Sequence, residues 1–351
     1  MRTRRITVRS RRFSLRVDLR VIGVLVMLAA ATLLVLTLNV ARGEFEIAPL
    51  DVLAALVGAG DDATSFIVLD LRLPRALTAI LAGAAFGIAG AIFQDIARNP
   101  LVSPDIIGIS AGAALAGVGL IVFGNINGAI SVPLAALAGA LISGAALYGL
   151  AWRGGVQGYR LVLIGIGVAA LLQAGISYVL ARGQIFEVAL AFVWLVGSLN
   201  GRGWEHVWPL AATLAVLLPL ALGLGRQLEV LQLGDDVARA LGIGVERARL
   251  ALLAVAVVLT GVAVSAAGPI AFVAFIAPHI ARRVCATVSP SGILPVAAAA
   301  AAGALLVLAA DLAGRLVFAP TEVPVGIVTS IIAAPYFLFL LRRANRLGVT
   351  G

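Results

Sequence analysis

The chain has 351 residues, of which 62% are hydrophobic and only 12% are charged, and its formal net charge is +9. Soluble domains carry about 25% charged residues, and long apolar runs account for the deficit, so the composition excludes an ordinary water-soluble protein. All 26 basic residues are arginines. A P-loop of the usual form requires a lysine after its glycines, so the chain has no ordinary Walker-type nucleotide site of its own.

The apolar runs predict an all-α integral membrane protein that forms a single transmembrane domain over residues 1–351. They do not alternate apolar and polar residues as the strands of a membrane β-barrel do. Ten of them have about the 17–25 residues that the bilayer core demands. The expected spans are 19–40, 74–97, 106–123, 131–151, 161–181, 206–225, 249–267, 269–284, 292–313 and 324–341.

The distribution of arginines predicts that both termini are cytoplasmic. An even number of spans places the two termini on one side, and an inner location of the arginine-rich tail, residues 1–18, then leaves twenty arginines inside. Such an excess of arginine is typical of cytoplasmic loops. It accounts for the positive net charge of the chain without any nucleic-acid partner. The six outer arginines are Arg42, Arg72, Arg75, Arg182, Arg202 and Arg315.

Several local features follow in chain order. A short helix is expected over 49–57, and residues 61–65 are expected in an outer loop before the second span. The pair Gly83 and Gly87 is a motif for close helix approach. A short extra helix outside the membrane is expected within 188–199.

The longest inner loop, 226–249, contains the densely charged stretch GDDVARALGIGVERAR. Asp235 or Asp236 is expected to cap a short helix, Val237 and Leu241 share one face, and Gly242 is a natural stop. A second short helical turn is expected over 245–249. Helices this short are not stable alone in water, so lipid or a protein must hold their apolar face. Glycine-broken helices make poor interfacial anchors, which favours a protein partner.

The remaining polar residues indicate no catalytic or metal site. Cys285 is the single cysteine, which precludes an intrachain disulfide. His279, at a helix end beside Arg282 and Arg283, is interpreted as a structural boundary residue rather than a metal ligand. His206 lies between tryptophans typical of a membrane interface. No cofactor, metal or enzymatic activity is therefore expected in this chain.

Four long motifs, in this order and spacing, resemble the permease subunits of the iron-siderophore, haem and cobalamin ABC importers. They are LRLPRALTAILAGAAFGIAGAIFQDIARNPLVSPDIIGISAGA (71–113), LGDDVARALGIGVERAR (233–249), GPIAFVAFIAPHIAR (268–282) and DLAGRLVFAPTEVPVGIVTSIIAAPYFLFLLRR (311–343). The resemblance covers about residues 65–343. The chain departs from the family at Ala271 and Ala274, where glycine is common, and at Asp95, where a small or apolar residue is more usual.

The resemblance implies a type II importer in the cytoplasmic (inner) membrane of a bacterium, surrounded by lipid. Its other parts would be a second permease subunit, identical or paralogous, an ATPase dimer that binds ATP and Mg, and a periplasmic or lipid-anchored substrate-binding protein. The resemblance also implies that the inner loop forms the coupling contact with the ATPase. The residues expected there are Gly234, Asp235, Asp236, Val237, Ala238, Arg239, Ala240, Leu241 and Gly242.

The resemblance gives three outer arginines a role as well. At the matching positions, arginines of related permeases meet glutamates of the binding protein, so Arg72, Arg75 and Arg315 are expected to form the docking surface. An arginine fork suits a carboxylate partner by geometry and charge. The alternative, that they anchor helix ends by pairing with Asp70 and Asp311, remains open.

Two other functional classes remain as alternatives, an ion-coupled secondary transporter without an ATPase and a membrane scaffold that transports nothing. Charges deep in the membrane commonly mark ion or proton coupling, and the predicted spans contain almost none. This scarcity favours an ATP-driven importer for an iron chelate over an ion-coupled carrier.

Overall fold

The computed structural model describes residues 5–10, 13–43, 45–124, 131–285, 292–317, 319 and 321–347. Four arginines of the expected cytoplasmic tail, Arg2, Arg4, Arg11 and Arg12, lie outside the described residues. The described residues of the tail form an antiparallel hairpin of β1 (Arg5–Ser10) and β2 (Phe13–Asp18), which the sequence analysis did not anticipate. After the hairpin, all named elements are helices.

In chain order these helices are α1 (Leu19–Ala41), α2 (Pro49–Leu56), α3 (Asp62–Ser65), the π-helical turn η1 (Phe66–Arg72), α4 (Leu73–Ala97), α5 (Ile109–Phe123), α6 (Ser131–Ala151), α7 (Gly158–Arg182), α8 (Ile185–Leu195), α9 (Trp204–Gly223), α10 (Gly225–Leu231), α11 (Asp235–Ala240), α12 (Val245–Ala267), α13 (Val273–Val284), α14 (Ile293–Leu316) and α15 (Val325–Leu347). Among the described residues, seven helical segments are long and apolar enough to cross a membrane. The shorter apolar helices among these residues are α5, α8 and the part of α15 over Val325–Phe339, whereas α13, the expected eighth span, is not one of them.

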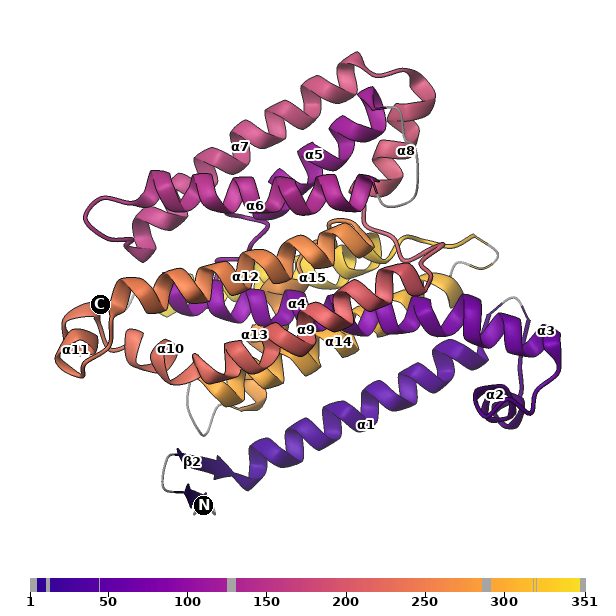
Figure 1. Ribbon diagram of the computed structural model, residues 1–351, viewed down its shortest axis with the longest axis horizontal. Helices are drawn as coiled ribbons and strands as arrows, with labels where there is room; N and C mark the ends of the chain where they lie inside the picture. The colour runs from indigo at the N-terminus through magenta and orange to yellow at the C-terminus, as the bar shows by residue number, and fades with distance from the viewer. Residues whose placement is uncertain are drawn as a thin grey trace.

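The two ends of the bundle can be told apart in Figure 1, where β2 and α11 lie at the left and α2 and α3 lie at the right. The left end is the predicted cytoplasmic end. Helix α15 runs from the outer end to the inner end: the backbone N–H of Gly326 bonds Gly197 in the outer half, whereas the ring of Tyr336 packs on His279. The His279 ring in turn bonds the carbonyl of Pro100, in the segment after α4.

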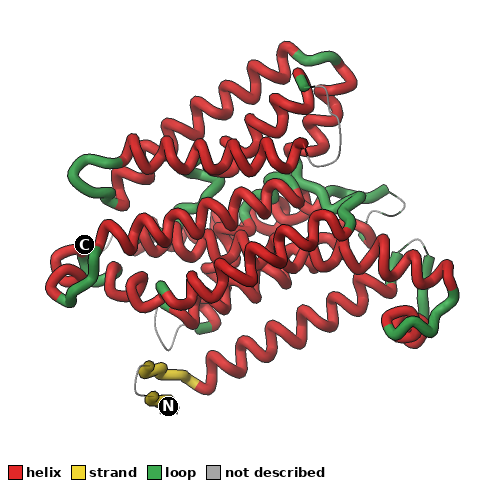
Figure 2. The backbone as a smooth tube through the Cα atoms, in the orientation of Figure 1, coloured by secondary structure: helices red, strands yellow, loops and turns green. Residues whose placement is uncertain are grey.

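Helix α4 lies at the centre of the molecule, packed against α12, α13 and α14 (Figure 2). Small residues permit this packing. A Cβ added to Gly83 would lie 2.2 Å from the carbonyl oxygen of Gly303, and one added to Gly87 would lie 2.1 Å from that of Ala299. The predicted packing role of Gly83 and Gly87 is thereby confirmed, because only glycine lets the two backbones approach this closely.

We expect Gly83→Ala to destabilise the folded protein by about 1–3 kcal/mol, because the added methyl forces two closely packed backbones apart. Gly167→Ala on α7 is the matched control, since a Cβ at that position meets nothing within 4 Å. Thermal unfolding in one detergent measures both variants. Equal midpoints for the two would show that the α4–α14 contact tolerates the methyl.

Several predicted boundaries were wrong. Residues 61–65 are not a loop: Asp61 accepts the N–H of Thr64 and starts α3, and the helix continues through η1 into α4 as one segment of 36 residues. Pro74, which lacks an N–H, lies directly after η1, where the wider π-helical turn accommodates it. The expected 49–57 and 188–199 helices are present as α2 and α8, the latter starting earlier.

The eighth span is shorter than expected. Helix α13 has 12 residues and begins only after Phe272, which adopts a left-handed conformation with φ +66°. At 1.5 Å per residue it is about 18 Å long, well short of the bilayer core of about 30 Å. The turn formed by residues 268–272 therefore lies between α12 and α13 inside the bundle rather than at its outer surface.

Candidate functional site

The predicted coupling stretch forms the short helix α11, at the inner end of the bundle. The N-cap is Gly234, with φ +113°, and it makes no side-chain capping bond. The prediction that Asp235 or Asp236 caps the helix was therefore wrong, and both carboxylates lie in the first turn instead. Gly242, with φ +80°, ends the helix as predicted. The expected second turn over 245–249 is not a separate helix, because Val245 begins α12.

Helix α11 presents apolar side chains to the outside. Leu233, Val237 and Leu241 are 63%, 44% and 61% exposed, whereas Ala238 is buried against the bundle. Exposed apolar residues are unremarkable when single, but these three gather on one short segment. Asp236 pairs locally with Arg239, and both side chains are exposed. The expected shared face of Val237 and Leu241 is therefore present and uncovered in the isolated chain.

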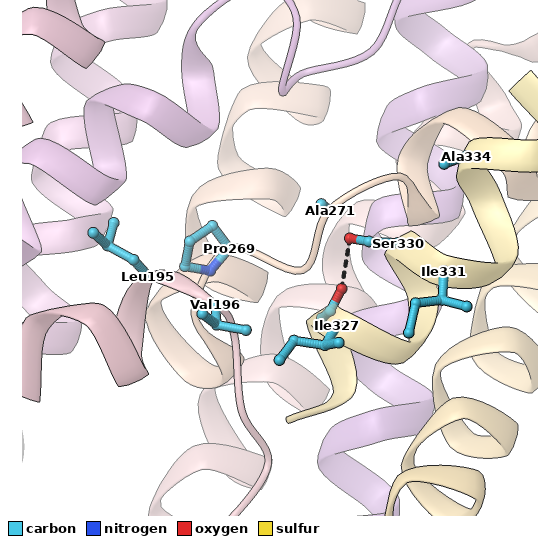
Figure 3. A pocket seen from close by; sticks show the side chains of 9 residues that line it. Leu195, Val196, Pro269, Ala271, Ile327, Ser330, Ile331 and Ala334 are labelled. Atoms are coloured by element: carbon cyan, nitrogen blue, oxygen red, sulfur yellow. Dashed lines mark hydrogen bonds between the residues drawn. The ribbon is translucent and has the colours of Figure 1, made fainter. Parts of the chain in front are cut away.

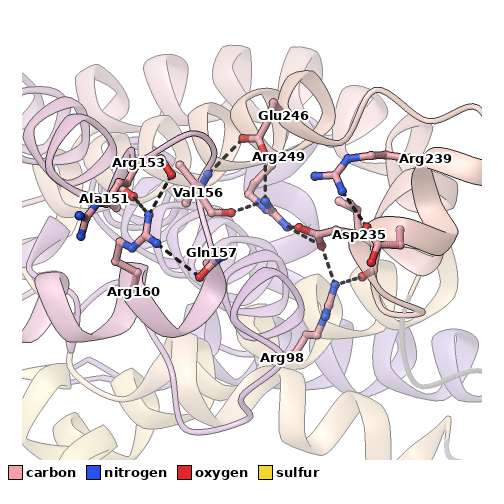
Figure 4. Close-up of polar contacts among 12 residues, drawn as sticks. Arg98, Ala151, Arg153, Val156, Gln157, Arg160, Asp235, Arg239, Glu246 and Arg249 are labelled. Carbon is pink, nitrogen blue, oxygen red and sulfur yellow. Dashed lines mark hydrogen bonds and ion pairs between the residues drawn. The ribbon is translucent and has the colours of Figure 1, made fainter.

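Asp235 turns away from this exposed face and joins two spans. Its carboxylate accepts one bond of 2.9 Å from Arg98, next to the end of α4, and two of 3.0 and 3.2 Å from Arg249 in the first turns of α12 (Figure 4). The Arg249 side chain is only 4% exposed. A buried guanidinium that loses its carboxylate is costly, so Asp235 is fixed by the fold.

Arg249 extends the same network toward the turn between α6 and α7 (Figure 4). It donates to the carbonyl of Val156 and to Glu246. The Glu246 carboxylate accepts the N–H of Val156 at 3.2 Å. Arg160 lies on the same inner face, but its contacts, with residues 151, 153 and 157, all remain within the α6–α7 region.

The inner end of α4 is tied to the loop and to α13. Arg98, with φ +48°, also donates to the carbonyl of Leu231 at the end of α10. Gln232 donates to the backbone carbonyl of Asp95 at 2.5 Å. The Asp95 carboxylate is buried and pairs with Arg282 of α13 at 3.1 Å. Asp95, one of the departures from the family pattern, is thus half of an interhelical ion pair.

The three arginines of the expected docking surface, Arg72, Arg75 and Arg315, have partners within the chain. Arg72 donates to the carbonyls of Val40, Ala41 and Phe45, which lie at and just after the end of α1. It therefore fixes the outer end of α1 to the long segment that contains α4. Arg72 and Arg75 both lie inside the continuous helical segment Asp62–Ala97.

Arg75 and Arg315 share one carboxylate. Asp311 of α14 is 2% exposed, pairs with Arg75 at 2.9 Å and lies 3.5 Å from Arg315. Arg315 also donates to Asn39 of α1. The other side of Arg75 meets Glu322 at 3.0 Å, and Glu322 is 41% exposed. The anchoring alternative is confirmed for Asp311, but Arg72 bonds backbone carbonyls rather than Asp70. The docking role stays a prediction.

A pocket of about 510 Å³ opens between the end of α8, the α12–α13 turn and α15 (Figure 3). Its lining is apolar apart from Ser330, whose hydroxyl bonds the carbonyl of Gly326. The full lining is Leu195, Val196, Pro269, Ala271, Gly326, Ile327, Ser330, Ile331 and Ala334. None of these residues is titratable, so the pocket offers surface and no acid–base chemistry.

Within the described part of the chain, no three His, Cys, Asp or Glu side chains gather as a metal site would require. Burial raises the pKa of the Cys285 thiol, which keeps this group protonated and unreactive. His279 packs on Phe275 and Tyr336 and bonds Pro100, which agrees with its interpretation as a structural residue.

Comparison with known proteins agrees with this architecture. Residues 31–343 match the FecCD transport family. The chain is 40% identical to the achromobactin transport system permease protein CbrC of Dickeya dadantii, over 95% of each chain. It is 43% identical to the ferric enterobactin transport system permease protein FepG of Escherichia coli, over 84% of this chain and 88% of the relative.

A solved structure shares the fold. It is described as an inward-facing conformation of a metal-chelate type ABC transporter, and it superimposes with a TM-score of 0.79 at 24% identity, over 92% of this chain and 99% of that chain. The family match covers nearly all of the membrane-spanning part, and the curated relatives extend along almost the whole length. The chain is therefore a multi-pass membrane permease subunit that belongs to the FecCD transport family.

Proposed function

We propose that the chain is the membrane-spanning subunit of an ATP-driven importer that moves an iron chelate across the cytoplasmic membrane of a bacterium. Relatives named for achromobactin, ferric enterobactin, iron(3+)-hydroxamate and Fe(3+)-citrate support the substrate class. A second permease subunit, an ATPase dimer and a substrate-binding protein would complete the assembly.

The observation that carries the proposal is the exposed face of α11. Leu233, Val237 and Leu241 lie uncovered at the inner end of the molecule, on a helix too short to persist without support. Asp235, in the same loop, is fixed to the bundle by Arg98 and Arg249. These ion pairs hold α11 in place, so its exposed face is a preformed surface. An apolar anchor within a charged rim is the usual anatomy of a protein contact, and we assign this face to the ATPase.

At the outer end, we propose that the arginine cluster Arg72, Arg75 and Arg315 receives the binding protein. Arg75 is the arginine that a carboxylate of the binding protein would reach, because its partner Glu322 is partly exposed at the outer end of the bundle. An incoming carboxylate can replace Glu322 on the guanidinium while Asp311 keeps its own bond. Arg72 and Arg315 then hold the surrounding helix ends in place.

Glu322→Gln is expected to tighten binding-protein docking about two- to fivefold at low salt, since it removes the internal competitor for Arg75 and exposed pairs contribute about 0.2–1 kcal/mol. The gain should shrink as salt rises, because rim charges act through screened electrostatics. Surface plasmon resonance on the assembled transporter measures the affinity, with Glu46→Gln, at the exposed outer pair with Arg42, as control. Unchanged docking would assign Arg75 to local anchoring alone.

Uptake into proteoliposomes tests the function directly. The complex purified from native membranes through a tag on this chain should contain an ATPase, and uptake of radioactive iron as a citrate, hydroxamate or catecholate chelate should require ATP inside and binding protein outside. Uptake that persists without ATP and follows an imposed proton or sodium gradient would establish the secondary-transporter alternative instead. Failure of any ATPase to co-purify would also contradict the proposal.

A further inference from the structure

One carboxylate joins α11 to two spans at once. Asp235, at the start of α11, bonds Arg98 at the end of α4 and Arg249 at the start of α12. The apolar residues of α11 face outward, so its attachment to the bundle depends on this joint, on the buried Ala238 and on the chain itself. A displacement of α11 would therefore move the end of α4 and the start of α12 before other parts of the bundle.

The inner half of α4 and the short helix α13 form one packed body. A Cβ on Gly90 would lie 1.7 Å from the carbonyl oxygen of Ala274, so the two backbones are in direct contact. Gln94 donates to the carbonyl of Phe275, and Asp95 pairs with Arg282. Contacts in the first turn and near the end of α13 fix it to α4, so α13 follows any movement of α4.

The far end of this body forms part of the pocket wall. The turn before α13 contributes Pro269 and Ala271 to the lining. Asp105, which also accepts the hydroxyl of Ser110 at 2.5 Å, bonds the backbone N–H of Phe272 in the same turn. On the opposite side Thr329 of α15 donates to the carbonyl of Ala271 at 3.1 Å. The turn thus lies between the α5 region and α15, beside the pocket in Figure 3.

We propose that the Arg98–Asp235 joint transmits movement of α11 to the α4–α13 body, and that this body changes the shape of the pocket at Pro269 and Ala271. The inference rests on the proposed function, because the ATPase is what would move α11. Arg98 and Asp235 act here as positioning residues, through the helices that they join. Packed helices move as rigid units rather than deform continuously. The α4–α13 body can therefore connect the α11 face with the pocket.

A cysteine in the pocket reports the effect. Ser330→Cys in a Cys285→Ser background places one thiol in the lining, and its maleimide labelling rate is compared in the nucleotide-free and the ATP-plus-vanadate-trapped complex. The parent should show a nucleotide-dependent change in rate. Arg98→Gln should reduce that change about five- to tenfold, the lower part of the usual range for coupling between sites, while ATPase co-purification persists. Asp235→Asn should reduce it to the same extent, measured only in the complexes that retain the ATPase, because Asp235 also belongs to the proposed contact.

Arg160→Gln is the matched control, because it removes an arginine from the same inner face without touching α4, α10 or α11. It should behave like the parent. The double variant Arg98→Gln/Asp235→Asn should be no worse than either single variant if the two residues form one joint. Additive losses, or a nucleotide response of the pocket thiol that survives both single changes, would overturn the inference.

The outcomes separate this inference from the proposed function. If no ATPase accompanies the parent protein, the proposed function fails. If the complex assembles and hydrolyses ATP but the pocket thiol labels at one rate in both states, or if Arg160→Gln lowers the response as much as Arg98→Gln does, the joint is not the connection and the proposed function still stands.

Discussion

Leu241→Asp is expected to lower ATP-driven uptake by about tenfold or more while the protein remains inserted in the membrane. Leu241 is 61% exposed at the end of α11, so the new carboxylate meets water in the free chain and costs the fold little. In the proposed contact it would be buried without a partner, which costs several kcal/mol, and each 1.4 kcal/mol is tenfold in affinity. Uptake and ATPase co-purification are measured together.

Leu241→Met is the control, because it preserves an apolar side chain of similar volume. It should retain both uptake and ATPase association. Full uptake by the aspartate variant with a normal amount of bound ATPase would refute the assignment of the α11 face. Normal association with lost uptake would instead place Leu241 in transmission rather than in contact.

Asp311→Ala is expected to destabilise the protein by about 3–5 kcal/mol, the usual cost of leaving a buried ion without its partner. Asp311 is 2% exposed and is the shared carboxylate of Arg75 and Arg315. Its loss leaves the positive charges of two arginines facing each other beside the ends of α4 and α14. Thermal or denaturant unfolding in detergent measures the effect, with yield in the membrane as a second readout.

Glu46→Ala provides the contrast, because its pair with Arg42 has side chains 75% and 55% exposed and such pairs contribute about 0–1 kcal/mol. A double variant, Arg75→Met with Asp311→Leu, should recover part of the stability lost in Asp311→Ala, since apolar residues of similar volume often replace buried pairs at little cost. A midpoint for Asp311→Ala equal to that of Glu46→Ala would show that the outer network is not stabilising.

The sequence predicted local backbone features at the inner end of the bundle but not the partners of its charged side chains. Gly242 was identified as a helix stop because its left-handed φ is a local property of glycine. Asp235 was assigned to capping because acidic residues favour helix starts, but its carboxylate meets Arg98, 137 residues earlier in the chain. No pattern within one segment specifies such a partner. Asp95 was identified only as a departure from the family pattern, and its partner Arg282 lies 187 residues later in the chain.

The sequence by itself determined the all-helical membrane class, most of the apolar spans and, through four motifs, the family, and it predicts an inner location for the charged loop. These properties follow from composition, run length and arginine distribution, which act locally or as sums over the chain. The tertiary structure alone decided that α3, η1 and α4 are continuous, that α13 begins only after Phe272, and which carboxylate meets which arginine. These outcomes depend on contacts between residues far apart in the chain, where burial makes each polar group take the nearest partner that the packing of helices provides.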